Sequence, residues 1–164
     1  MKNHQLTKRF ANLLVVVCFM VLTSSLLGAC AMLSFKGDKV KWTQLTLSAS
    51  DDVNNNSPIA VDVVLVTDET LVAKLAELPA SKWFAARADL ANTYPEGLRY
   101  RSWEVVPGQQ LVVPGETFEG PRVAAAFIFA NYPAPGAHRV RIEQFGGRLA
   151  VQLDNNTFSV PAVK

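Results

Sequence analysis

The feature that most limits what this chain can fold into is a long apolar segment that ends at a cysteine. Residues 13–27 are predominantly apolar, Lys2, Lys8 and Arg9 precede them, and Leu27-Gly28-Ala29-Cys30 closes the segment. A basic start, an apolar stretch and small residues before a cleavage point are the layout of a secretory signal. The motif at the end is that of a lipobox, so only the chain from Cys30 onward is expected to fold.

Each lipobox residue suits a step of lipoprotein processing. Leu27 fits an apolar subsite of a signal peptidase, and the small residues Gly28 and Ala29 let the chain enter its active site. Cys30 then carries diacylglycerol on its sulfur and an N-acyl chain, such as palmitate, on its new amino terminus. A plain membrane anchor is the alternative, but the apolar core is short for the ~20 residues of a bilayer span. Because Ala31 rather than Asp follows, we expect the outer membrane, with the folded domain in the periplasm.

The composition of the processed chain excludes several classes of protein. Of the 16 Lys and Arg residues three precede Cys30, so 13 remain beside all 14 Asp and Glu residues, a net side-chain charge of −1. This balance is unlike that of a nucleic-acid-binding protein. Cys30 has no later cysteine to pair with, and His138 is the only later histidine. We therefore expect no intrachain disulfide, no Cys/His metal site and no cofactor besides the acyl chains.

Three parts follow from these boundaries: a signal peptide over 1–29, a lipidated N terminus and tether over 30–40, and one domain over 41–164. Residues 41–49 alternate as a half-buried strand. Leu45 and Leu47 share one face with Thr43, whereas Trp42 is predicted to lie on the more polar face. A polar loop then leads to Pro58.

The next segments change from strand to helix and back. Residues 59–66 form a strand that is apolar on both faces, so it is expected to be covered on both sides. A helical insertion spans about 68–92. Asp68 or Thr70 is predicted to cap its first helix, Pro79 to end that helix, and Ser81 to cap the second.

Strands resume after the insertion. They are expected at 98–105 and 110–113, on either side of a turn at 106–109. Residues 123–132 are apolar on both faces and too few to span a membrane, so they are predicted to form a central buried strand.

The C-terminal third is predicted to be a three-stranded meander over 136–162. Gly146-Gly147 suits a two-residue hairpin turn, which would place Ile142 opposite Val151. A second turn at Asn155-Asn156 would place Leu153 opposite Phe158, and Val151 opposite Val160. The sum is seven or eight strands in a mainly β, two-sheet sandwich, with the helical insertion between strands 2 and 3.

The order of these motifs resembles the TssJ family, the outer-membrane lipoproteins of type VI secretion systems. The resemblance rests on the lipobox, on the strand and polar loop before residues 57–66, on the helices, and on the Trp strand with its Pro-Gly turn over 103–109. It implies a transthyretin-like β-sandwich that binds the periplasmic C-terminal part of a TssM protein. Asp62 and Val64 stand where members often carry Arg and Tyr.

By position, the resemblance assigns partner binding to the loop between the first two strands. Its residues are Asp51, Asp52, Val53, Asn54, Asn55, Asn56 and Ser57. This loop is short compared with the family pattern. The sequence therefore leaves open whether the partner is TssM-like or another envelope protein.

Catalysis and ligand binding are the alternatives to a docking role. His138 follows a Pro-Gly pair and is expected on the surface, and the chain has no Gly-x-Ser-x-Gly motif. No two of Glu96, Glu104, Glu116 and Glu119 stand out as a carboxylate pair. The acidic loop matches no EF-hand, so it predicts no calcium site. Trp42 and Tyr100 are the better surface candidates for a ligand or glycan platform, whereas Trp83 and Trp103 are expected in the core.

Overall fold

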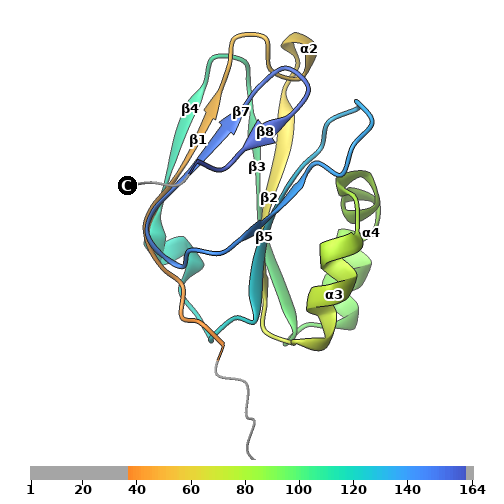
Figure 1. Cartoon of the computed structure of the whole chain (residues 1–164), viewed down its shortest axis with the longest axis vertical. Coiled ribbons are helices and arrows are strands. Elements are labelled where there is room, and N and C mark those ends of the chain that lie inside the picture. Colours follow the sequence, from red (N-terminus) through yellow and green to blue (C-terminus); the bar gives the residue numbers. More distant parts are fainter. Residues whose placement is uncertain (1–36, 162–164) are drawn as a thin grey trace, which may run out of the picture. The chain divides into compact units, whose positions relative to one another are not determined.

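The computed structural model describes residues 37–161, which form two four-stranded sheets packed face to face with helices on one outer side (Figure 1). One sheet has the order β4-β1-β7-β8 and the other β3-β2-β5-β6. The elements in chain order are β1 (Lys41–Ala49), α2 (Val53–Asn56), β2 (Ile59–Val66), α3 (Thr70–Glu77), α4 (Ala80–Thr93), β3 (Leu98–Val105), β4 (Gln110–Pro114), η1 (Gly115–Phe118), β5 (Ala125–Ala130), β6 (Arg139–Ile142), β7 (Gly146–Leu153) and β8 (Phe158–Ser159). The predicted two-sheet sandwich with a helical insertion between β2 and β3 is confirmed.

Strand β1 departs from strict alternation at Thr43. Its register against β7 shifts between Trp42 and Gln44, and an extra residue of this kind changes the phase of the side chains. Trp42 is consequently 4% exposed and belongs to the same core as Leu45. Its Nε1 donates to the backbone oxygen of Gln144 at 2.8 Å. The prediction that Trp42 lies on the polar face is wrong, because it counted the alternation straight through this irregularity.

The central strands β2 and β5 are buried on both faces, as the sequence predicts. Every residue of β5 is buried, and Ala60 is the one residue of β2 that is half-buried. β2 lies between β3 and β5 in its sheet, with Val61 opposite both Trp103 and Ala130. One face of this pair meets the other sheet, and the opposite face meets the helices.

The helical layer is held to β2 by one buried charge. Asp62 is fully buried, and Trp83 Nε1 donates to its Oδ2 at 2.8 Å. Arg87 Nη1 donates to both carboxylate oxygens, at 2.9 and 2.8 Å. The Trp83 ring also stacks on Phe129 at 5.1 Å. Since a buried carboxylate is tolerated only when it is paired and hydrogen-bonded, these contacts fix α4 against the sheet.

The two helices begin close to the predicted positions, with one correction. Asp68 Oδ1 accepts a hydrogen bond from the backbone N–H of Thr70 at 2.9 Å, so Asp68 caps α3. The second helix begins at Ala80 rather than after Ser81, which makes the predicted Ser81 cap wrong. The backbone N–H of Ala80 donates to the oxygen of Ala137 at 2.8 Å. This contact with a distant loop satisfies a free N–H of the first turn, so no side-chain cap is needed.

The predicted hairpin at Gly146-Gly147 is wrong. Both glycines belong to β7, which pairs in parallel with β1, whereas β6 pairs with β5 in the other sheet. The chain between β6 and β7 therefore crosses from one sheet to the other. Ile142 and Val151 are both buried in the sandwich core. The prediction that both residues are apolar core positions is confirmed, but they belong to different sheets and do not pair.

The second turn of the predicted meander is confirmed in part. Leu153 pairs with Phe158, as the turn at Asn155-Asn156 requires. β8 ends at Ser159, so the predicted pairing of Val151 with Val160 does not form.

Both apolar clusters of the described residues are built from side chains within 37–161. We therefore expect the domain to fold without the signal segment. Within residues 37–161, no helix is both long and apolar enough to cross a membrane. The lipobox residues Leu27, Gly28, Ala29 and Cys30 lie outside the described residues.

Candidate functional site

The segment Asp51–Ser57 forms a left-handed turn at one end of the sandwich, where Figure 1 shows α2. Asn54, Asn55 and Asn56 have φ angles of 49°, 55° and 59°. The N–H groups of Asn56 and Ser57 donate to the oxygens four residues earlier, at 3.4 and 3.2 Å. Asparagine tolerates this region better than other residues with a Cβ, and this explains the run of three.

Two residues of the turn anchor it from within. Val53 is 0% exposed and packs into the sandwich core. Asn54 Nδ2 donates to the backbone oxygen of Pro58 at 2.8 Å, and its Oδ1 is buried without a partner among the described residues. Asn55 and Asn56 are exposed. The turn thus has an anchored start and a free outer side.

Two further turns meet this segment. Ser50 N–H donates to Leu153 at 2.8 Å, and Gly108 N–H donates to Ser50 at 3.1 Å, both to backbone oxygens. Asn155 Nδ2 also donates to Asp52 Oδ2 at 3.3 Å. Residues 50–58, 106–109 and 154–157 therefore form one surface, which we call the loop end.

A fourth segment, between β5 and β6, also contacts the loop end. The Tyr132 hydroxyl lies 3.0 Å from the backbone oxygen of Asp154 and 2.6 Å from that of Thr157. Burial, and then the charge of Asp154, raise the pKa of Tyr132, so the hydroxyl keeps the proton that it donates. The His138 ring packs on Tyr132 at 4.9 Å, and its Nε2 lies 2.8 Å from the Ala134 oxygen. His138 is half-buried rather than a simple surface residue.

The loop end carries acidic and amide groups. Asp51, Asp52 and Asp154 are exposed, and these segments contain no Lys or Arg. The hydroxyl of Ser50, which donates to Asp52 at 2.7 Å, lowers the pKa of that carboxyl, and partial desolvation opposes it. Val106 adds an apolar patch, 47% exposed. Such a surface offers acceptors, amide donors and one apolar contact, which suit protein docking.

The turn at Gly108 brings the second loop close to the first. Gly108 has a φ of +71°, and a Cβ there would lie 2.8 Å from Asp51 Oδ1. A side chain at this position would be strained and would push the two loops apart. The close approach of the loops therefore depends on glycine.

The structure exposes five of the seven predicted docking residues, leaves Asn54 half-buried and buries Val53. Sequence reasoning identified the turns at 106–109 and 155–156, but it did not place them beside Asp51–Ser57. The sequence indicates these turns only by their turn-forming residues. It does not indicate that the turns lie together, because this depends on the pairing of β1 with both β4 and β7.

The residues considered for other functions are not arranged as sites. Glu96, Glu104, Glu116 and Glu119 are exposed, and residues 37–161 contain no group of three potential metal ligands from His, Cys, Asp and Glu. None of the Trp or Tyr rings in that range is exposed. Tyr100 is half-buried against the helices and Trp42 is buried, so the aromatic surface platform is absent from the described residues.

The described chain is a β-sandwich with a helical insertion, and three hydrogen-bonded turns form its loop end. No protein-family model matches the chain, and no curated protein matches it either. Solved structures do match. The T6SS lipoprotein TssJ1 from Pseudomonas aeruginosa superposes with a TM-score of 0.60 at 13% identity, covering 77% of this chain and 98% of its own.

Two other matches come from the same secretion system. Serratia marcescens Lip, a membrane-bound component of the type VI secretion system, gives a TM-score of 0.54 at 13% identity, over 74% of this chain and 96% of its own. A chain in a structure described as the T6SS protein TssM C-terminal domain from EAEC gives 0.53 at 12% identity, over 73% and 97%. The chain is therefore TssJ-like in fold and divergent in sequence.

Proposed function

We propose that this chain is a membrane-anchored docking lipoprotein of a type VI secretion envelope complex. The observation that carries the proposal is the fold, which matches 98% of the TssJ1 chain with a TM-score of 0.60. The order of lipobox, polar loop and strands supports the same role. The function is to hold a partner at the membrane and not to catalyse a reaction.

The loop end is the surface that we assign to a TssM-type periplasmic domain. Its three turns are tied together by hydrogen bonds, so little conformational freedom is lost on binding. Its exposed groups are carboxylates, amides and Val106. The surface is acidic without basic residues, and the matching partner surface is therefore expected to be basic.

The anchor is the acylated Cys30 at the inner leaflet of the outer membrane. Two or three acyl chains hold a protein stably, whereas a single chain is marginal. The domain then lies in the periplasm, where a partner that reaches from the inner membrane can meet it.

The test is a binding measurement with residues 36–164 and a purified TssM-type periplasmic domain from the same bacterium. One variant replaces the exposed residues Asp51, Asn55, Asn56 and Ser57 with Gly or Ser, and keeps Val53 and Asn54, which anchor the turn. We expect the intact domain to bind and the variant to lose at least tenfold in affinity, because a few central residues carry most of the energy of an interface.

A matched control replaces Glu143 and Gln144, which are exposed in the link between the sheets, with Ser and Gly. It should bind like the parent. If all three proteins bind equally, the role stands and the docking site lies elsewhere. If the parent does not bind, the proposed partner is wrong.

A further inference from the structure

A group of basic side chains lies where the described chain begins, at the end of the domain opposite α2 (Figure 1). Asp38 and Val123 form an antiparallel bridge, with both backbone hydrogen bonds at 2.8 Å. This pairing places Lys39 opposite Arg122. Arg122 Nη1 also donates to the backbone oxygen of Gly37 at 2.9 Å. Both basic side chains therefore lie beside the point where the tether joins the domain.

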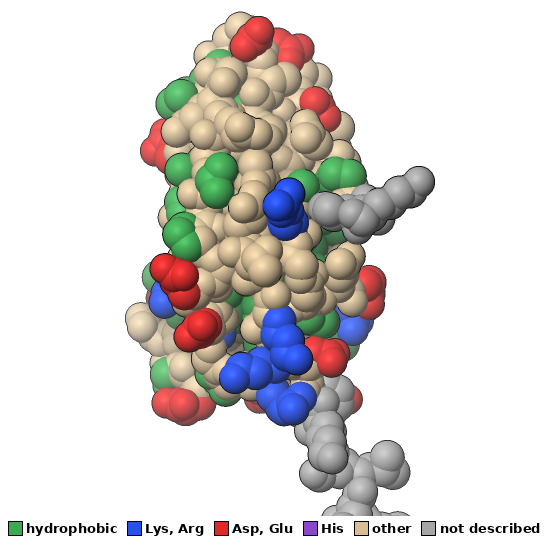
Figure 2. Space-filling view, turned by 90° about the vertical axis from the view of Figure 1, so that its left-hand side faces the viewer, with side chains coloured by type: hydrophobic (Ala, Val, Ile, Leu, Met, Phe, Trp, Pro, Cys, Tyr) green, Lys and Arg blue, Asp and Glu red, His purple; other side chains and the backbone are tan. Residues whose placement is uncertain are grey.

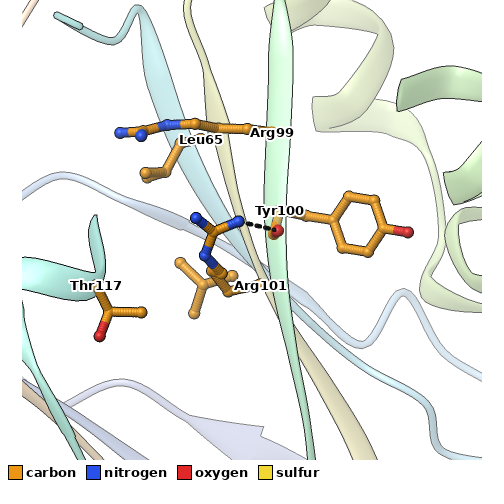
Figure 3. A pocket seen from close by; sticks show the side chains of 6 residues that line it. Leu65, Arg99, Tyr100, Arg101 and Thr117 are labelled. Atoms are coloured by element: carbon orange, nitrogen blue, oxygen red, sulfur yellow. Dashed lines mark hydrogen bonds between the residues drawn. The ribbon is translucent and has the colours of Figure 1, made fainter. Parts of the chain in front are cut away.

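Two arginines of β3 extend this group. Arg99 and Arg101 point to the η1 side of the strand, whereas Tyr100 points toward the helices (Figure 3). Arg99 donates to the backbone oxygens of Glu119 and Phe118, at 2.6 and 2.9 Å. A Cβ at Gly120 would lie 2.3 Å from Arg99 Nη1, so the guanidinium rests on the loop that leads to Arg122. We call Lys39, Arg99, Arg101 and Arg122 the basic patch.

Among the described residues, no carboxylate forms an ion pair with a side chain of the basic patch. The two ion pairs found between 37 and 161 use Arg87 and Arg141. Asp38, Glu116 and Glu119 lie in the same region and are exposed, but none forms an ion pair there. Burial, and then the positive charge of Arg101, lower the pKa of Arg99. The patch is therefore a group of basic side chains that form no direct ion pair, although Glu116 and Glu119 line the same hollow as Lys39.

The geometry of the tether places this patch near the bilayer. Six residues lie between Cys30 and Gly37, and the seven residue steps from one to the other span about 25 Å at most when the chain is fully extended. Figure 2 shows Lys and Arg side chains at mid-height and below on one face, with acidic side chains around them, while its upper third carries acidic side chains and no basic ones. The domain from Cys30 has a net charge of −1, so only a local patch can attract it to an anionic surface.

We propose that the basic patch binds the phosphate groups of anionic phospholipids in the membrane that holds the tether. The inference rests on the proposed lipid anchor and adds a second, electrostatic contact. Guanidinium groups suit phosphate because they donate two hydrogen bonds in a fixed fork. The contact orients the domain with its loop end away from the bilayer, where a partner can reach it.

The experiment measures sedimentation of residues 36–164 with lipid vesicles. The acyl chains and the partner are both absent, so failure of the proposed function cannot change the result. We expect binding to phosphatidylcholine vesicles that contain one-third phosphatidylglycerol, and none to pure phosphatidylcholine. The variant Lys39→Gln/Arg122→Gln should bind roughly 20-fold more weakly, since each basic side chain near a surface contributes on the order of fivefold.

The matched control is Lys82→Gln/Arg141→Gln, which removes the same charge from two exposed residues outside the patch. It should bind within about twofold of the parent, and circular dichroism should show that both variants are folded. Equal losses in the two variants, or no binding by the parent at low salt, would overturn the proposal. It would also be overturned if inorganic phosphate saturates the patch while anionic vesicles do not bind.

Discussion

The two ends of the sandwich are built on the same strands but with different chemistry. At the loop end, three turns are joined by hydrogen bonds between Ser50, Gly108 and Leu153, and the exposed charges are acidic. At the end where the tether joins, Arg99 and Arg122 donate to backbone oxygens, and their charges have no carboxylate partner among residues 37–161. One end uses polar groups to fix its own shape. The other carries arginines that form no ion pair with a carboxylate among the described residues.

This difference in charge distinguishes the two ends of the domain. Opposite charges at opposite ends favour one orientation at an anionic surface, whereas a uniform domain would lie there in many orientations. In the orientation that we propose, the loop end faces away from the bilayer. The division predicts that substitutions at one end change one function, and that substitutions in the shared core change both.

The largest expected effect comes from removing the anchor. Cys30→Ser should leave the domain folded but reduce its retention in the membrane fraction by roughly 100-fold or more, because the patch alone binds far more weakly than acyl chains. Fractionation of cells at physiological salt measures this. If the variant remains in the membrane fraction as well as the parent, the lipobox assignment is wrong.

The next effect lies in the core that both ends share. Asp62→Ala leaves Trp83 Nε1 and the Arg87 guanidinium without their buried acceptor, and it should lower the free energy of unfolding by about 3–5 kcal/mol. Urea denaturation measures it. The double variant Asp62→Leu/Arg87→Met should recover much of the loss, since it removes both charges. A single-variant loss below about 1 kcal/mol would show that α4 is held by packing alone.

A smaller effect tests the left-handed turn. Asn55 has a φ of 55°, and its side chain is exposed. Asn55→Ala should cost about 1 kcal/mol, while Asn55→Gly should be neutral or slightly stabilising, because only the backbone conformation is at stake. Thermal unfolding compares the two. Vesicle binding should not change in either variant, and equal stabilities for alanine and glycine would contradict the strained turn.

The smallest effect is the pH response of Asp52. The Ser50 hydroxyl lowers the pKa of this exposed carboxyl below its ordinary value of 3.8. The charged form is therefore favoured by folding, and the stabilisation is present above pH 3.8 and lost as the pH falls through the lower folded value. A carboxyl NMR titration gives the pKa directly. In unfolding experiments, the advantage of the parent over Asp52→Asn should vanish in that acidic range, and a pKa above 3.8 would refute the bond.

The sequence by itself determined the local elements of this protein. The apolar runs, interrupted only by Asp62 in β2, predicted the buried strands β2 and β5, because a strand covered on both faces is apolar at most of its positions. The turn residues at Asn155-Asn156 gave the register of Leu153 with Phe158. The sequence also predicted the Asp51–Ser57 loop between two strands, and five of its seven residues are exposed.

Only the tertiary structure decided how these elements meet. Val151 and Ile142 lie in different sheets around one core and not along a hairpin, and an apolar pattern is the same in both arrangements. The bulge at Thr43 places Trp42 on the same face as Leu45, because one extra residue changes the alternation between the residues before it and those after it. The loop end and the basic patch each join segments distant in sequence. Hydrophobic periodicity predicts whether a side chain is buried or exposed, whereas the residues that it contacts depend on how the whole chain packs.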